Sequence, residues 1–198
     1  MIKVGITGGI GSGKTTVCKV FESLGIAIYY ADDRAKWLMQ NDQTLKTALQ
    51  AAFGQDIYHP DGSLDRPKLA GLVFNNAEQL AVLNSLVHPA VFLDTEAWQA
   101  QQALSGAPYT LREAALLIES GSYLVLDKLI VVTANEDLRI ERVMARDKST
   151  ADEVRARISK QLPDAEKIKL ANFVIYNEGD MDSLNAQVMA IHRELLGG

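Results

Sequence analysis

The chain has 198 residues, which is long enough for one substantial hydrophobic core and too short for two independent ones. Its 47% hydrophobic and 23% charged residues exclude a disordered chain, and no apolar run approaches the roughly 18 residues of a membrane span. The formal net charge of −5 argues against general nucleic-acid binding, although a few local cations suffice to hold a phosphate ligand.

An apolar strand is expected over residues 2–7, and the glycine-rich segment Gly8–Thr15 follows it directly. This segment matches G-x-x-x-x-G-K-[ST], and helical spacing continues after it to a stop at Gly25. Glycines let successive N–H groups turn toward one anion, Lys14 can reach the β- and γ-phosphates, and Thr15 can hold Mg²⁺. The sequence therefore predicts a nucleoside triphosphate site. The expected ATP-binding residues here are Gly9, Ile10, Gly11, Ser12, Gly13, Lys14, Thr15 and Thr16.

A second strand is expected over residues 27–31, and Asp32 and Asp33 follow it. In open parallel sheets, ligands bind at the carboxyl ends of the strands, on the edge where a phosphate loop also lies. A carboxylate there can accept a proton from a hydroxyl and orient it for attack on the γ-phosphate. Either aspartate could instead cap the next helix, and the residues alone leave both roles open.

Roughly 70 mostly helical residues separate the second and third expected strands, too many for a simple crossover. Helical patterns run to about residue 40 and then over 44–53, 65–74 and 77–104. We interpret residues 36–104 as a substrate-holding insertion in one compact unit, with a core of approximately 1–35, 105–138 and 171–198.

Alternating strands and helices predict a parallel α/β sheet covered on both faces. The remaining elements are expected as strands at 109–115, 128–133 and 173–176 and helices at 137–146, 150–160, 164–170 and 181–196. Arg139, Arg142 and Arg146 share one helical face, where guanidinium groups could clamp phosphates. A solvated face paired with Glu136 and Glu141 is the alternative.

Two acidic residues, Glu113 and Glu119, are candidates for holding Mg²⁺ through water, the alternative being a buried or capping carboxylate. The chain lacks the Asn-Lys-x-Asp guanine signature of Ras-type GTPases and the apolar strand ending in Asp that is typical of motor ATPases. Its three histidines lack metal-ligand spacing, so no zinc site is expected. A small-molecule kinase fits this pattern best.

The single cysteine, Cys18, excludes an internal disulfide. It falls on the helix after the loop, where it could be a packing residue or a reactive thiol, and the sequence leaves both roles open. A lone cysteine agrees with a reducing compartment, and the sequence shows no signal peptide, so we expect a cytoplasmic protein.

Taken together, these residues resemble the dephospho-CoA kinase family over nearly the whole chain. The matching motifs are Gly5–Thr16, Leu24-Gly25, Ala31-Asp32, Leu64-Asp65-Arg66, His88-Pro89, Leu116–Gly121, Arg142–Asp147, Gln161 and Phe173–Asn177. The resemblance implies a three-layer α/β P-loop kinase fold with a five-stranded parallel sheet in the order 2-3-1-4-5, a helical substrate-binding insertion and a helical lid at approximately residues 139–170. It also implies transfer of phosphate from ATP to the ribose 3′-hydroxyl of dephospho-CoA, with Mg²⁺, in a monomer or weak homo-oligomer without nucleic-acid or membrane partners.

The resemblance also assigns roles to individual residues. Asp32 matches the family's proposed base, and Lys14 and Arg142 complete the implied catalytic set. Asn177 joins Arg142 on the ATP side. The implied substrate-binding residues are Asp32, Lys36, His88, Leu117 and Glu119.

Four positions depart from the family pattern: Tyr30 and Asn172 replace aspartates, Lys36 replaces an arginine and Ala115 replaces a proline. None of them removes Lys14 or the other implied catalytic residues. Two other functions stay open. One is a kinase for a different small metabolite, which a panel of acceptors would separate; the other is a nucleotide-binding regulatory protein, which would give no phosphorylated product.

Overall fold

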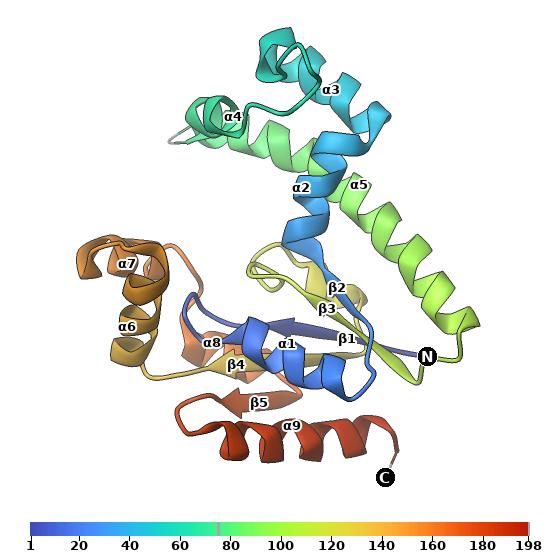
Figure 1. Ribbon diagram of the computed structural model, residues 1–198, viewed down its shortest axis with the longest axis vertical. Helices are drawn as coiled ribbons and strands as arrows, with labels where there is room; N and C mark the ends of the chain where they lie inside the picture. Colours follow the sequence, from blue (N-terminus) through green and yellow to red (C-terminus); the bar gives the residue numbers. More distant parts are fainter. Residues whose placement is uncertain (75, 198) are drawn as a thin grey trace. The chain divides into compact units, whose positions relative to one another are not determined.

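The computed structural model describes residues 1–74 and 76–197 and divides the chain into two compact units (Figure 1). The first unit contains Met1–Tyr30 and the described part of Gln101–Gly198, and the second contains Ala31–Ala100. Within the described ranges, no helix is both long and apolar enough to cross a membrane.

The first unit is built on a five-stranded parallel sheet with the order β2-β3-β1-β4-β5. Its strands are β1 (Ile2–Thr7), β2 (Ile28–Tyr30), β3 (Tyr109–Glu113), β4 (Lys128–Thr133) and β5 (Phe173–Tyr176). The predicted sheet and its order are confirmed. Strands β2 and β3 are shorter than expected. The chain enters helix α2 at Ala31, directly after β2. Strand β3 ends at Glu113, and the last hydrogen bond to β1 runs from the Ala114 N–H to the Ile6 carbonyl.

Helices cover both faces of this sheet, as the alternation of side chains along β4 shows. Ile130 and Val132 pack in one cluster with residues of α1 (Lys14–Ser23) and α9 (Met181–Leu195). Leu129 and Val131 point to the opposite face, because successive side chains of a strand alternate. That face is covered by Leu117 and by α8 (Asp164–Leu170). The remaining elements of this unit are α6 (Glu136–Asp147), α7 (Ala151–Ile158) and the 3₁₀ turn η2 (Ser122–Val125).

The second unit is helical. It comprises α2 (Ala31–Asn41), α3 (Gln43–Phe53), the 3₁₀ turn η1 (Gln55–Ile57), α4 (Arg66–Val73) and most of α5 (Ala77–Leu104). Arg34 on α2 holds Asp94 on α5 through two hydrogen bonds of 2.9 and 2.5 Å. Asp42 and Asp65 cap α3 and α4 by accepting backbone N–H bonds, which favours those helix starts.

Candidate active site

The loop between β1 and α1 has the backbone shape that an anion site needs. Gly11 and Gly13 have φ angles of 78° and 90°, which residues other than glycine rarely adopt. A Cβ at Gly13 would lie 2.0 Å from Nδ2 of Asn177, so the close approach also requires glycine there. Among the residues that the structure describes, the N–H groups of Gly11 and Gly13 have no acceptor. They lie beside the positive end of α1, which begins at Lys14, an arrangement that can bind phosphate.

The polar side chains at the end of the loop and the start of α1 differ in exposure, and Ser12 is buried. Lys14 donates from Nζ to the carbonyl of Gly8 at 2.9 Å, so its ammonium group follows the curve of the loop. Thr15 and Thr16 are exposed on the first turn of α1. The N–H of Ile10, one of the predicted ATP-binding residues, donates to Oε1 of Gln161 at 2.8 Å.

Arg142 and Asn177 both lie against this loop, as the sequence interpretation requires of an ATP site. Nδ2 of Asn177 donates to the Ser12 carbonyl at 2.8 Å, and Nη2 of Arg142 donates to the Asn177 carbonyl at 3.0 Å. The other terminal nitrogen of Arg142, Nη1, is buried and has no hydrogen-bond partner in the described part of the chain. It lies 3.9 Å from the position that a Cβ would take on Gly13. A buried, unpaired guanidinium nitrogen is costly unless a ligand completes it, so this group points to an anion.

The three arginines predicted to share one face of α6 have different surroundings. Arg139 is 5% exposed, and it binds the Ile10 carbonyl and the Asp164 carboxylate. Arg146 is exposed and pairs with Asp147. The alternative of a solvated face therefore fits only Arg146, whose partner in the structure is Asp147 instead of the expected Glu136 or Glu141.

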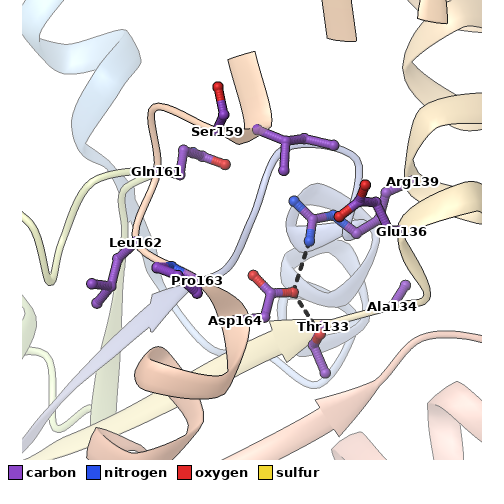
Figure 2. A pocket seen from close by; sticks show the side chains of 10 residues that line it. Thr133, Ala134, Glu136, Arg139, Ser159, Gln161, Leu162, Pro163 and Asp164 are labelled. Carbon is purple, nitrogen blue, oxygen red and sulfur yellow. Dashed lines mark hydrogen bonds and ion pairs between the residues drawn. The ribbon is translucent and has the colours of Figure 1, made fainter. Parts of the chain in front are cut away.

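Sequence reasoning missed Asp164, which pairs with Arg139, and Thr133, which bonds Asp164; together with Gln161 they line a pocket of about 390 Å³ (Figure 2). No local signal could have found this arrangement, because Asp164 lies 25 positions from Arg139 and 31 from Thr133. Figure 2 shows Asp164 between Thr133 and Arg139, joined to both by dashed lines.

Glu113 lies at the end of β3, beside the central strand that leads into the loop. It is 9% exposed, and its register partner on β1 is Ile6. Cys18 is fully buried on α1, and burial, together with the charges of Glu113 and Glu22, raises the pKa of its thiol. A buried, protonated thiol favours the packing role of Cys18 over the reactive one.

Leu117 and Glu119 follow β3 and are held inside the first unit. The Leu117 side chain is 0% exposed and would lie 2.6 Å from a Cβ at Gly5, so it packs over β1. A side-chain contact between Leu117 and substrate, predicted from the resemblance, therefore gains no support from its position. Glu119 accepts the Leu162 N–H at 3.1 Å and forms an ion pair of 3.0 Å with the wholly buried Lys167. Burial raises the pKa of Glu119, but its backbone hydrogen bonds and Lys167 outweigh this effect and lower the pKa overall.

The remaining predicted residues belong to the second unit. Asp32 lies exposed in the first turn of α2, outside the hydrophobic interior. Its neighbour Asp33 pairs with Lys36 at 2.7 Å, so these two side chains neutralise one another at the surface. His88 is exposed and precedes Pro89 within α5.

Two of the departures from the family pattern have structural partners in the first unit. The Tyr30 hydroxyl donates to Glu22 at 3.0 Å. Asn172 accepts the Leu129 N–H at 2.8 Å and returns a backbone bond to the Leu129 carbonyl at 2.9 Å, which aligns the start of β5 with β4.

Comparison with known proteins places this site in a family. A family model described as dephospho-CoA kinase matches residues 2–183. The chain belongs to the dephospho-CoA kinase family. It is a kinase of the last step of coenzyme A biosynthesis, and the family's substrates are ATP and dephospho-CoA.

Individual relatives agree with this assignment over their whole length. The dephospho-CoA kinase of Salinibacter ruber is 40% identical, with 100% of each chain covered. That of Corynebacterium efficiens is 38% identical over 99% of this chain and 98% of its own. Among solved structures, a Thermus thermophilus protein has a TM-score of 0.83 at 35% identity, covering 98% of this chain and 97% of its own. The dephospho-CoA kinase of Campylobacter jejuni has a TM-score of 0.71 at 27% identity, covering 99% and 98%.

Proposed function

We propose that this chain transfers the γ-phosphoryl group of MgATP to the ribose 3′-hydroxyl of dephospho-CoA, and that Lys14, Arg142 and Asp32 carry the reaction. The unpartnered Nη1 of Arg142 beside Gly13 is the observation that supports this assignment most strongly. Phosphoryl transfer depends mainly on positioning and on neutralising charge, for which a buried guanidinium is well suited.

The phosphate loop holds the nucleotide in this proposal. The free N–H groups of Gly11 and Gly13 and the start of α1 bind phosphate oxygens, and Lys14 exchanges the Gly8 carbonyl for the β- and γ-phosphates. Asn177 shapes the adenine side by fixing the Ser12 carbonyl. The 139–170 segment acts as a lid that keeps water from the transferred group.

The donor set fits Mg²⁺. Thr15 presents an exposed hydroxyl at the first turn of α1, and Mg²⁺ prefers oxygen ligands while keeping several waters and phosphate oxygens. Thr15 would hold the ion directly, and Glu113 is the candidate for holding it through water. When bound, Mg²⁺ neutralises charge on the phosphate oxygens.

Asp32 accepts the proton of the 3′-hydroxyl and orients its oxygen for attack. Its carboxylate is exposed in the first turn of α2, where a hydroxyl can reach it. Residues 36–104, with Lys36 and His88, hold the acceptor in this proposal, and Glu119 acts from the first unit. We further propose a cytoplasmic enzyme, monomeric or weakly homo-oligomeric, that binds neither nucleic acid nor membrane.

The deciding experiment is mass detection of coenzyme A after the purified protein is incubated with MgATP and dephospho-CoA. Wild type should form coenzyme A and ADP in equal amounts, and a Lys14→Ala variant should form neither at a comparable rate. A panel of other hydroxyl acceptors tests for a different metabolite kinase. ATP binding without any phosphorylated product would indicate a regulatory protein and overturn the proposal.

A further inference from the structure

Arg139 contacts the phosphate loop from α6 through both its side chain and its backbone. It is 5% exposed, and its Nε donates to the Ile10 carbonyl at 2.9 Å. A Cβ on Gly9 would lie 2.2 Å from Nη2 of Arg139, and one on Gly11 would lie 2.4 Å from its carbonyl oxygen. Arg139 therefore touches three successive residues of the loop.

A carboxylate fixed by β4 holds this guanidinium in place. Nη1 of Arg139 donates to Oδ2 of Asp164 at 2.9 Å, and the Thr133 hydroxyl donates to the same oxygen at 2.7 Å (Figure 2). Thr133 ends β4 and Asp164 begins α8, so the carboxylate is held between two elements of the first unit. A buried arginine with a hydrogen-bonded counter-charge keeps one orientation, whereas an unpaired one would be strongly destabilising.

The two contacts at Ile10 fix the peptide planes on both sides of it. Gln161 accepts the Ile10 N–H, which belongs to the plane shared with Gly9, and Arg139 binds the Ile10 carbonyl, which belongs to the plane shared with Gly11. In a trans peptide the C=O and N–H point in opposite directions. Because Arg139 holds the carbonyl, the Gly11 N–H points away from Arg139, and it has no acceptor among the described residues.

We propose that Arg139 is a positioning residue for phosphoryl transfer. By holding the Ile10 carbonyl it aims the Gly11 N–H at the triphosphate, and Asp164 and Thr133 hold Arg139 in that orientation. The task needs a guanidinium, because Nε and Nη1 bind two acceptors in different directions, whereas a lysine ammonium is a single nitrogen on a flexible stem. This inference rests on the proposed function of the loop as the ATP site.

The test compares Arg139→Met, Arg139→Lys and Thr133→Val with the control Arg193→Met, which removes an exposed arginine near the end of α9. We expect Arg139→Met to weaken ATP binding about tenfold in calorimetry and to lower kcat about 10²-fold, since a small misplacement of reacting groups has effects of that size. The KM for dephospho-CoA should stay within about twofold of wild type. Arg139→Lys and Thr133→Val should give intermediate losses of ATP affinity and kcat, and the control should lose neither.

A second readout follows the loop itself. The amide signal of Gly11 in ¹⁵N-labelled protein should lose hydrogen-exchange protection in the ATP complex of Arg139→Met and regain part of it in Arg139→Lys. A merely structural role predicts a lower melting temperature with wild-type ATP affinity, kcat and Gly11 protection, and that result overturns the proposal. Should Arg139→Met not fold, Arg139→Lys and Thr133→Val decide by the same measurements. ATP affinity and Gly11 exchange remain informative even if wild type forms no coenzyme A, so failure of the proposed function is recognised separately.

Discussion

Two arginines one turn apart on α6, Arg142 and Arg146, lie in opposite surroundings. Arg142 lies beside the phosphate loop, with one nitrogen on the Asn177 carbonyl and the other buried without a partner. Arg146 lies one turn later in solvent, where it pairs with Asp147 at 2.7 Å. Asp147 also accepts a 3.0 Å bond from Arg157, and these two arginines lower the pKa of its carboxyl.

This difference shows that helical spacing groups side chains on a face without setting their roles. Arg142 has a buried nitrogen, Nη1, without a hydrogen-bond partner among the described residues, so it can donate to a ligand. Its charge attracts an anion more strongly there than in water, because burial reduces screening. The charge of Arg146 is already matched and screened by water, where such pairs contribute little. We therefore expect catalysis to depend on Arg142 far more than on Arg146.

The largest effect should follow Arg142→Gln, which removes the positive charge and most donors while keeping a polar side chain. We expect kcat to fall about 10³-fold, the scale on which a charged group at a transferring phosphoryl acts. Arg142→Lys should recover part of this loss because it keeps the charge. Steady-state kinetics with dephospho-CoA measure both variants. A Gln variant that keeps more than about a tenth of the wild-type kcat would contradict the role.

The next largest effect should follow a substitution in the second unit, at the proposed base Asp32. Asp32→Asn should lower kcat at least about 10²-fold, because an amide cannot accept the hydroxyl proton. ATP affinity, measured by calorimetry, should match wild type, in contrast to the loop variants. Asp33→Asn is the matched control, since Asp33 is the adjacent carboxylate and pairs with Lys36. Equal losses in both variants would remove the special role of Asp32.

A smaller effect, on stability, should follow Lys167→Met. Lys167 is 0% exposed and Glu119 is 22% exposed, so the change leaves a half-sheltered carboxylate without its cation. We expect the free energy of unfolding to fall by about 2 kcal/mol, less than for a fully buried pair, because Glu119 keeps its backbone bond from Leu162. Lys169→Met removes an exposed ion pair with Glu166 and should change the free energy of unfolding by less than about 0.5 kcal/mol.

The stability difference between wild type and Lys167→Met should depend on pH through the carboxyl group of Glu119. The pKa of Glu119 is lowered from its ordinary value of 4.5, so its contribution is present at neutral pH and is lost as the pH falls below 4.5 and through the lowered pKa. Urea denaturation of wild type and Lys167→Met should therefore give curves that converge in acid. A difference that persists unchanged at about pH 3 would assign the loss to packing alone.

Sequence alone predicted the elements whose signals are local. The strand at 2–7, the glycine loop, the sheet order implied by the resemblance and the helix over 77–104 agree with the structure. It could not assign separate surroundings to the arginines of α6, because Asp164, Gln161 and Asn177 reach the loop from distant parts of the chain. Nor could it show that the Leu117 side chain packs over Gly5, since a motif match does not say which side chain turns inward; the substrate contact of Leu117 stays a prediction.

The smallest effect should follow Arg146→Gln, and it completes the comparison along α6. Arg146 has an exposed side chain, and its loss leaves Asp147 paired with Arg157 at 3.0 Å. We expect kcat to change by less than about threefold and stability by less than about 0.5 kcal/mol, as for other exposed pairs. Kinetics and urea denaturation, with Arg142→Gln measured alongside, check both values. A loss of kcat approaching that of Arg142→Gln would mean that Arg146 leaves Asp147 during turnover and reaches the phosphates, so Arg142 and Arg146 would then act as one clamp.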